Sequence, residues 1–397
     1  MQRVKNYYHL LRAIVANLSH GFPSKKLTVI GVTGSDGKTT TTSLIYHILN
    51  TAQKKVSMVS TVGAIINGTT YDVGFHVTNP APSQLQKFIK KALVSGNDTE
   101  KKYMVIEATS HGIDQYRVWG IPFTIGVITN VSDEHLDYHK TYEKYVTTKA
   151  KLLLSSKQSI INKDDRSYSY ISAFLTKKKY KGNILTYGLS DADITPELFP
   201  FKTTLLGNYN TYNVLAGIST CLQLGIEKET ILSAIDSFQA PIGRAQIVYQ
   251  KDFRVMIDFA HTSNSFEQIL SSVRPQVKGR IIHVFGSAGK RDVAKRKVMG
   301  ENSSKYADVI ILTAEDPRSE DVNHIIDQIA QGISKKRKIE VLKIPDRTRA
   351  ITTAIAMAKR NDMVICTGKA HEKSMNLGHG EESWDEFAVV KKALEQR

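Results

Sequence analysis

The residues with the clearest chemical potential form a short glycine-rich loop, residues 31–40, with the sequence GVTGSDGKTT. Glycines let backbone N–H groups turn inward around phosphate oxygens, a lysine can reach the outer phosphates, and a threonine hydroxyl can hold Mg²⁺. An apolar run before the loop and a helical pattern after it favour this site over a simple turn with an exposed lysine. The loop predicts that nucleotide phosphates bind to Gly34, Ser35, Asp36, Gly37, Lys38, Thr39 and Thr40.

Two more polar clusters follow apolar runs further along the chain. Glu107 opens the sequence EATSH, and a carboxylate at the end of a strand can bind the metal ion that serves the phosphates, although alone it would be read as a loop residue. Residues 129–139, TNVSDEHLDYH, place His135 among acidic residues, which favours a metal or phosphate site over an isolated structural histidine. Lys149, in a helical stretch, is by itself an ordinary surface lysine.

These clusters need a sheet that brings them to one edge. Apolar, strand-like runs begin near residues 29, 56, 103, 123 and 159 and alternate with helical stretches, of which 40–49, 142–154 and 213–224 are the clearest. That alternation is typical of a mainly parallel sheet with helices on both faces. The carboxyl ends of such strands line the ligand crevice of a doubly wound sheet, where the clusters are expected to meet.

A second alternation of strands and helices starts at about residue 253, after a stretch at 239–244 that contains proline and glycine. Its strand-like runs are RVMIDF, RIIHVFG, DVIILT, IEVLKI and DMVICTG. The predicted fold class is therefore α/β, with a central P-loop ATPase-like, doubly wound domain followed by a smaller Rossmann-like α/β domain. We expect a helical segment at 1–26, the central domain at 27–245 and the C-terminal domain at 246–397.

Composition narrows the class of protein. The chain has 397 residues, of which 41% are hydrophobic, enough for two or three domains with real cores. The two cysteines, Cys221 and Cys366, exclude a disulfide framework and suit a reducing compartment, so a cytoplasmic location is expected. No run is long enough to span a membrane. Residues 1–20 predict an amphipathic helix packed on the body of the protein, with a role at a membrane surface less favoured.

The net charge of +16 is compatible with nucleic acid, an acidic membrane or anionic small substrates. We find no helix-turn-helix, zinc-finger or RNP-type pattern, so a nucleic-acid partner is not expected. A positive electrostatic field would also suit a protein that binds ATP and a phosphorylated or carboxylated substrate.

The ordered motifs together resemble the Mur ligase family, the ATP-dependent amino-acid ligases of cell-wall precursor synthesis. Within it they are most similar to the UDP-N-acetylmuramyl-tripeptide synthetases. The resemblance covers about residues 27–395. Besides the clusters above and Lys149, it is carried by the stretches GNYNTYN at 207, GR at 243, DFAHT at 258, GSAGKRD at 286, EDPRSE at 315 and GKAHE at 368.

The resemblance implies ATP and Mg²⁺, an acyl-phosphate intermediate, a small-molecule or peptide acceptor, an amino acid, and a monomer. Lys38, His135 and Lys149 would be catalytic, and Thr39, Glu107, His135 and a CO₂-carbamylated Lys149 would hold magnesium. The nucleotide would contact Asn210, Asn213, Arg244, Asp258, His261 and Arg347. The acceptor would contact Thr78, Asn79, Thr109, Ser110 and Arg117. The incoming amino acid would contact Asp316, Arg318, Gly368 and Glu372.

Two departures from the family leave the substrates open. Only about 30 residues precede Gly31, too few for the family's leading domain that holds uridine diphosphate, so the acceptor is uncertain. Where members that add meso-diaminopimelate have Asp-Asn-Pro-Arg, this chain has EDPR at 315–318. Arg318 suits a carboxylate and Asp316 an ammonium group. Diaminopimelate offers both groups and lysine only the second, so diaminopimelate is preferred and lysine remains an alternative.

Other functions stay open at this point. A related ligase could extend a different acid, as folylpolyglutamate and cyanophycin synthetases do. A basic, nucleic-acid-associated P-loop NTPase is less favoured. A catalytically idle partner subunit conflicts with the intact set of Lys38, Thr39, Glu107, His135 and Lys149.

Overall fold

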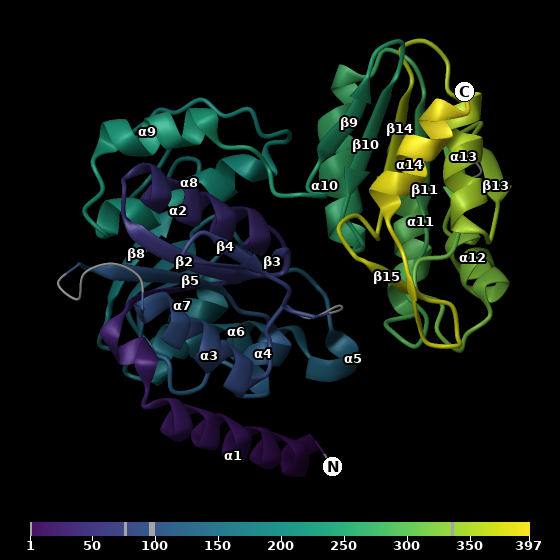
Figure 1. The fold of residues 1–397 in the computed structure, drawn as a ribbon. Helices are drawn as coiled ribbons and strands as arrows, with labels where there is room; N and C mark the ends of the chain where they lie inside the picture. The colour runs from purple at the N-terminus through teal and green to yellow at the C-terminus, as the bar shows by residue number, and fades with distance from the viewer. Residues whose placement is uncertain (1, 75–77, 95–99, 335–336) are drawn as a thin grey trace. The chain divides into compact units, whose positions relative to one another are not determined.

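The structure is a computed structural model that describes residues 2–74, 78–94, 100–334 and 337–397, with side chains from residue 5 onward. The chain forms two compact units, one of Met1–Leu205 with Tyr209–Gln239 and one of Leu206–Asn208 with Ala240–Arg397 (Figure 1). The division therefore follows Gln239, earlier than the expected boundary at 245, and the N-terminal helix belongs to the first unit. The earlier division has a physical cause, because Ala245 N donates to Asp258 Oδ2 and Phe259 N donates to Gly243 O within the second unit.

The first unit is built on an eight-stranded sheet in the order β4-β3-β2-β5-β1-β6-β7-β8. The strands from β2 to β8 in that order are parallel, and β3 and β4 add an antiparallel edge. In the register Val32 of β1 lies opposite Glu107 of β5 and Val127 of β6, so the three strands end together. The strands are β1 Thr28–Thr33, β2 Lys55–Ser60, β3 Gly63–Ile66, β4 Thr69–Tyr71, β5 Lys102–Glu107, β6 Phe123–Ile128, β7 Ser156–Asn162 and β8 Asn183–Tyr187.

Helices cover both faces of this sheet (Figure 1). Ile30 and Val32 of β1 pack in one core with α2 and α8, whereas Val29 packs in a second core with α3. This alternation confirms the doubly wound sheet predicted from the sequence. The helices are α1 Gln2–His20, η1 Pro23–Lys26, α2 Lys38–Thr51, α3 Pro82–Leu93, α4 Ser110–Asp114, α5 Leu136–His139, α6 Tyr142–Leu154, α7 Tyr168–Lys177, α8 Tyr209–Gln223 and α9 Lys228–Ser237.

The second unit has a six-stranded sheet in the order β13-β12-β11-β14-β10-β9, parallel except for β9 at one edge. Apolar cores lie on both of its faces. Its strands are β9 Gln246–Gln250, β10 Arg254–Asp258, β11 Ile281–Phe285, β12 Val309–Leu312, β13 Glu340–Lys343 and β14 Met363–Thr367, with a hairpin of β15 Ser374–Asn376 and β16 Glu381–Ser383. Its helices are α10 Ser263–Val273, η2 Arg274–Gln276, α11 Ala294–Tyr306, α12 Val322–Ala330, α13 Arg347–Met357 and α14 Glu386–Glu395. Among the residues that the structure describes, no helix is both long and apolar enough to cross a bilayer.

Candidate functional site

The glycine-rich loop lies between β1 and α2, and two neighbouring elements press against it. Gly37 has a φ of 78°, a left-handed conformation that favours glycine. A side chain at Gly37 would collide with Asn213 Oδ1 of α8, and one at Gly34 would collide with Thr129 Oγ1. Since α2 begins at Lys38, its first backbone N–H groups lie at the end of the loop. The loop therefore has the form of an anion site at a helix N-terminus.

Hydrogen bonds from the segment after β6 fix the loop backbone. Ser35 N donates to Asn130 O at 2.8 Å, and Asp36 N donates to Asn130 Oδ1 at 2.9 Å. Thr129 Oγ1 donates to Asp36 O at 2.7 Å. Lys38 folds back over the loop, with Nζ 2.7 Å from Ser35 O. The lysine amine is thus held at the loop itself, where the phosphates of a nucleotide would lie.

Glu107 meets the loop at the end of β5. Its two carboxylate oxygens lie 3.2 and 3.1 Å from Thr39 Oγ1, and both residues are buried. Thr61 completes the cluster, because its N and Oγ1 each donate to Glu107 at 2.9 Å. In the described part of the chain no three His, Cys, Asp or Glu side chains form a metal cluster. The donors at Thr39 are instead hydroxyl and carboxylate oxygens, a set that fits a Mg²⁺ ion shared with phosphate oxygens.

Lys149 is not a surface lysine. Its side chain is buried, and Nζ donates to Gly34 O at 2.5 Å. The ammonium lies 4.4 Å from the ring centroid of Tyr145, whose hydroxyl is 3.1 Å from Ser35 Oγ. Burial lowers the pKa of Lys149 well below its ordinary value, and the nearby Lys38 lowers it further. The structure thus places a lysine with a depressed pKa directly against the phosphate loop.

The histidines after β6 form an aromatic cluster beside Tyr145. His135 has a left-handed φ of 54°, and its ring centroid lies 4.9 Å from that of His111 and 5.9 Å from that of Tyr145. His139 is buried and lies 3.1 Å from Ser110 Oγ, so Ser110 is held in place by this ring. Burial, together with the nearby His111, lowers the pKa of His139 to about 4, which keeps its ring neutral.

The residues expected to face the acceptor form a network that continues from Glu107. Asn79 Nδ2 donates to Glu107 O at 2.6 Å, and Thr109 N donates to Asn79 Oδ1 at 2.8 Å. Arg117 Nη1 donates to Asn79 O at 2.5 Å. Thr78 Oγ1 lies 2.9 Å from Thr61 Oγ1. Thr78 is therefore linked through Thr61 to the Glu107 carboxylate, and Asn79, Thr109 and Arg117 are linked to the Glu107 backbone carbonyl. Ser110 is held separately by His139.

Two of the residues predicted to contact the nucleotide, Asn210 and Asn213, lie where α8 meets α2. Asn213 Nδ2 donates to Asn210 Oδ1 at 2.8 Å, and both side chains are buried. Asn213 Oδ1 also accepts from Thr41 Oγ1 at 3.4 Å and lies against Gly37. Asn213 thus supports the loop in addition to any contact with a nucleotide.

In the second unit, Asp258 ends β10 and fixes the turns beside it. Its Oδ2 accepts from Ala245 N and its Oδ1 from Ala260 N, both at 2.6 Å. The Arg244 guanidinium lies 4.6 Å from the centroid of the Phe259 ring. His261 Nδ1 lies 3.0 Å from Phe259 O. Burial, and then the charge of Lys295, lowers the pKa of His261 to about 3.

Charged side chains gather at the carboxyl ends of β12 and β14. Lys369 is buried and lies 3.0 Å from Asp316 Oδ1 and 2.7 Å from Glu372 Oε2. Glu315 is also buried, and its burial raises its pKa to about 7. Gly368, with a φ of 103°, packs directly against the Glu315 carboxylate.

The chain is similar to known proteins over most of its length. Residues 32–221 match the Mur ligase middle domain, and residues 243–370 match the Mur ligase glutamate ligase domain. The chain is 38% identical to UDP-N-acetylmuramoyl-L-alanyl-D-glutamate–2,6-diaminopimelate ligase of Aquifex aeolicus (strain VF5), over 94% of this chain and 79% of the relative. It is 35% identical to the ligase 1 of that name from Clostridium acetobutylicum, with the same coverage. The chain belongs to the Mur ligase family.

Solved structures agree with this assignment. A UDP-N-acetylmuramoyl-L-alanyl-D-glutamate–2,6-diaminopimelate ligase is 27% identical, with a TM-score of 0.60 over 93% of this chain and 78% of that one. A folylpolyglutamate synthase of Mycobacterium tuberculosis has a TM-score of 0.72 over 91% of this chain and 93% of its own, but is 14% identical and bears on the fold alone. This Mur ligase is thus an ATP-dependent enzyme that forms amide bonds, rather than a nucleic-acid-associated NTPase or an idle subunit.

Two predicted residues of this Mur ligase lie in surroundings that do not fit their expected roles. Arg347 was expected at the nucleotide, but it is buried and forms an ion pair with the buried Glu386, and Nη1 and Nη2 also donate to the carbonyls of Ala314 and Thr367. Its charge is therefore used inside the second unit. Asp316 was expected to receive an ammonium group of the substrate, but Lys369 already occupies that position.

Arg318 remains consistent with a substrate contact. It is partly exposed, and its Nη1 donates to Gly289 O at 2.6 Å. Its backbone has a left-handed φ of 53°, and its N donates to Asn376 O in the β15 hairpin at 2.9 Å. The hairpin thus holds Arg318 in place at the end of β12.

The sequence did not indicate Thr61, Tyr145 or Asn130 as site residues of this Mur ligase. Tyr145 carried a usable signal, since it precedes Lys149 by one helical turn on α6. Asn130 also carried one, because it lies within the 129–139 cluster. Thr61 carried none, because only the pairing of distant strands brings it to the loop.

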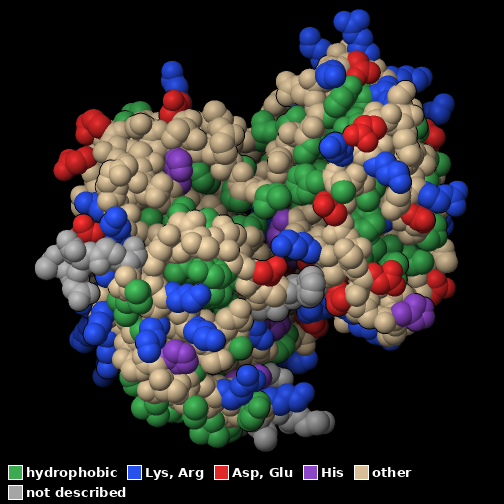
Figure 2. All heavy atoms as spheres, in the orientation of Figure 1, with side chains coloured by type: hydrophobic (Ala, Val, Ile, Leu, Met, Phe, Trp, Pro, Cys, Tyr) green, Lys and Arg blue, Asp and Glu red, His purple; other side chains and the backbone are tan. Residues whose placement is uncertain are grey.

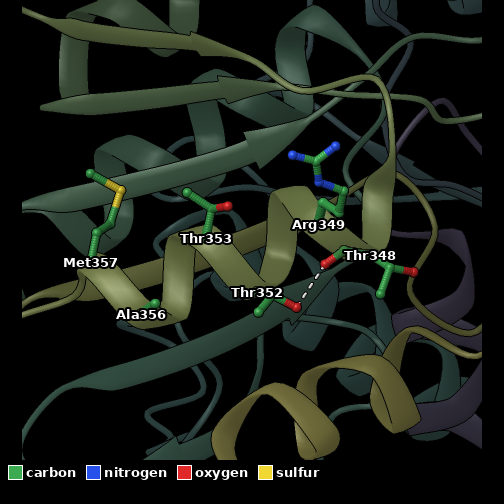
Figure 3. Close-up of a pocket in the computed structure, with 6 residues that line it drawn as sticks. All are labelled: Thr348, Arg349, Thr352, Thr353, Ala356 and Met357. Carbon is green, nitrogen blue, oxygen red and sulfur yellow. Dashed lines mark hydrogen bonds between the residues drawn. The ribbon is translucent and has the colours of Figure 1, made fainter. Parts of the chain in front are cut away.

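An open depression lies along α13, directly after the predicted residue Arg347 at the start of that helix. Figure 3 shows the residues that line it along that helix, where Thr352 Oγ1 donates to Thr348 O at 2.9 Å. It is lined by Thr348, Arg349, Thr352, Thr353, Ala356 and Met357. All of these come from one helix, so the depression has no opposing wall that would enclose a ligand.

Proposed function

We propose that this Mur ligase joins 2,6-diaminopimelate to a carboxylate of UDP-N-acetylmuramoyl-L-alanyl-D-glutamate, using ATP. The observation that carries the proposal is the convergence of the phosphate loop, Glu107 and Lys149 at one sheet edge, in a chain 38% identical to a relative named for that reaction.

The reaction needs positioning and charge stabilisation rather than a protein nucleophile. An oxygen of the acceptor carboxylate attacks the γ-phosphorus of ATP, the bond to the leaving ADP breaks, and an acyl phosphate forms. The amine nitrogen of diaminopimelate then attacks the acyl carbon. The tetrahedral intermediate loses inorganic phosphate and a proton, which leaves the amide.

The first unit would bind the nucleotide phosphates. Backbone N–H groups of the loop and of the start of α2 would bind phosphate oxygens, and Lys38 would move its amine from Ser35 O to the transferred phosphoryl group. Thr39 and Glu107, with His135, would hold Mg²⁺, which neutralises phosphate charge when bound. In the same unit, Asn210 and Asn213 of α8 would contact the rest of the nucleotide.

Lys149 is proposed to act as a carbamate. A neutral lysine amine forms an N–C bond with CO₂ and releases a proton, which converts a cation into a carboxylate-like group. The depressed pKa of Lys149 favours that neutral amine. Two ammonium groups beside one loop repel each other, whereas a carbamate at Lys149 attracts both Lys38 and a magnesium ion.

The second unit would select the amino acid. Diaminopimelate carries an amine and a carboxylate at the end that does not react. We assign the carboxylate to Arg318, through paired N–H donors, and the ammonium to Glu315, because Lys369 pairs with both Asp316 and Glu372. Gly368, which packs against Glu315, leaves room beside that carboxylate.

The test is a crossed substrate assay. Phosphate release from ATP is measured with the UDP-muramoyl dipeptide or with folate as the acceptor, each with meso-diaminopimelate, lysine or glutamate, and the product is identified by mass. We expect turnover with the dipeptide and diaminopimelate. Turnover only with folate and glutamate would contradict the proposal. A lack of amino-acid-dependent turnover with the muramoyl acceptor would contradict it as well.

A further inference from the structure

Helix α1 has two opposite faces, and one of them packs on the first unit. Ala13 and Asn17 are fully buried, and Asn17 Nδ2 donates to Trp119 O at 3.0 Å. Near the start of the helix, Asn6 Nδ2 donates to Asp114 Oδ2 at 3.0 Å. These contacts determine which face of α1 points away from the first unit.

The opposite face is an apolar stripe. Leu11 and Val15 are each 62% exposed and Leu18 is 63% exposed. At 100° per residue, the stripe positions fall on one side of the helix, away from Ala13 and Asn17. A contiguous row of large apolar side chains in water marks an interaction surface rather than an ordinary monomer surface. The apolar stripe consists of Tyr7, Tyr8, Leu11, Val15 and Leu18.

The surroundings of the stripe are basic. Lys5 and Arg12 flank it on α1, and α3, which packs against α1, carries exposed lysines. Residues 1–35 contain no aspartate or glutamate, and neither does α3. Figure 2 shows Lys and Arg side chains among hydrophobic ones over the lower part of the first unit, where Figure 1 places α1 and α3. From residue 5 onward, the lysines and arginines of α1, η1 and α3 are Lys5, Arg12, Lys25, Lys26, Lys87, Lys90 and Lys91.

We propose that the apolar stripe and these basic residues dock this protein on an anionic lipid surface, an interaction that goes beyond the proposed ligase activity. Apolar side chains of such a helix enter the region between headgroups and acyl chains, while lysines and arginines contact anionic headgroups. A second copy of the chain is a poorer partner, because two facing stripes would bring their basic flanks together.

The test is sedimentation of the full chain with vesicles of phosphatidylcholine and phosphatidylglycerol in equal parts, and with vesicles of phosphatidylcholine alone. We expect binding to the anionic vesicles that weakens as salt is added. The affinity of the double variant L11S/V15S for the anionic vesicles should be lower by about tenfold or more. K87Q/K90Q should weaken binding to anionic vesicles only. L198S is the matched control, since Leu198 is 64% exposed and belongs to none of these helices.

Phosphate release by L11S/V15S at the level of the unchanged protein confirms that the variant folds. Equal vesicle binding by L11S/V15S and L198S overturns the proposal, and so does a lack of binding by the unchanged chain. A concentration-dependent dimer that the double variant loses, without vesicle binding, also overturns it and assigns the stripe to a second copy.

Discussion

Lys149 and Lys38 place two amines beside one short loop. The depressed pKa of Lys149 favours its neutral form, which reduces the repulsion between the two amines. Lys149 Nζ donates to Gly34 O and lies 4.4 Å from the ring centroid of Tyr145. The sequence predicted the loop, Glu107 and Lys149 through motif and resemblance. It did not predict Thr61 or Tyr145, because their roles depend on which side chains meet after the strands pair. Nor could it show that Lys369 neutralises Asp316, since both become buried only in the fold.

Lys149→Ala should lower kcat by about a hundredfold or more, because the proposed carbamate is lost. Formate or acetate in the assay should restore part of the activity by supplying a free carboxylate. Lys151→Ala is the matched control on the same helix, where the lysine is half exposed and 3.5 Å from Asp114. An active Lys149→Ala enzyme would refute the assigned role.

Glu315 should make stability depend on pH. Its folded pKa of about 7 lies above the ordinary carboxyl value of 4.5, so its contribution to stability is complete below pH 4.5 and is lost as pH rises through 7. Glu315→Gln has no such group and should not show this loss. The free energy of unfolding of the variant minus that of the unchanged protein should therefore increase by up to about 3 kcal/mol between pH 5 and pH 8. Urea unfolding at both pH values measures the change, and a constant difference would contradict it. The exposed Glu340→Gln serves as the control.

At the scale of elements, most strands that the sequence predicted have apolar runs buried on both faces, whereas the predicted edge strand β13 is mostly exposed. Strand β1 is buried throughout, as are β5 and β11. The unpredicted strands lie at edges or in hairpins and are largely polar or exposed, as in β4 and β16. Their pairing comes from neighbouring strands rather than from hydrophobic periodicity, which is the signal that sequence reading uses.

The loop between β1 and α2 should fail if Gly37 acquires a side chain. Gly37→Ala combines a left-handed φ of 78° with a collision against Asn213, so ADP binding should be lost. Gly225→Ala is the matched control, with a φ of 77° and nothing within 4 Å of the added carbon. It should cost about 1 kcal/mol of stability and leave ADP binding unchanged. Calorimetric titration with ADP separates the two, and equal effects would contradict the clamp by α8.

The ion pair that joins α13 to α14 should contribute to stability rather than to catalysis. Arg347 and Glu386 are 1% and 0% exposed, so Arg347→Met would leave a buried carboxylate without its partner. We expect a loss of about 3–5 kcal/mol in the free energy of unfolding. The exposed pair of Lys343 and Asp327 is the control, and its removal should cost about 1 kcal/mol or less. A drop in kcat without a loss of stability would instead return Arg347 to the nucleotide site.

The whole molecule consists of two units, each with its own sheet and with cores on both faces. The chain passes between them more than once, because Leu206–Asn208 belong to the second unit and the residues on either side belong to the first. Leu206 packs in the core of the second unit. A fragment that starts at residue 240 therefore lacks part of that core.

Nucleotide binding should stabilise the protein by mass action. With ADP and Mg²⁺ at a hundred times the dissociation constant, the free energy of unfolding should rise by about 2.7 kcal/mol. Thermal unfolding at several ADP concentrations measures this rise, and Gly37→Ala should abolish it. A shift that persists in Gly37→Ala would place the nucleotide away from the loop.

The position of β1 in the sheet also determines when the phosphate site can form during synthesis. Strand β1 pairs with β5 and β6, which are separated from it in the sequence by the strands β2 to β4. During synthesis the loop therefore emerges early but cannot be held on both sides until residue 128 has left the ribosome. The clamp by Asn213 comes later still. The phosphate site thus belongs to the late stages of assembly, although its motif is among the first to be translated.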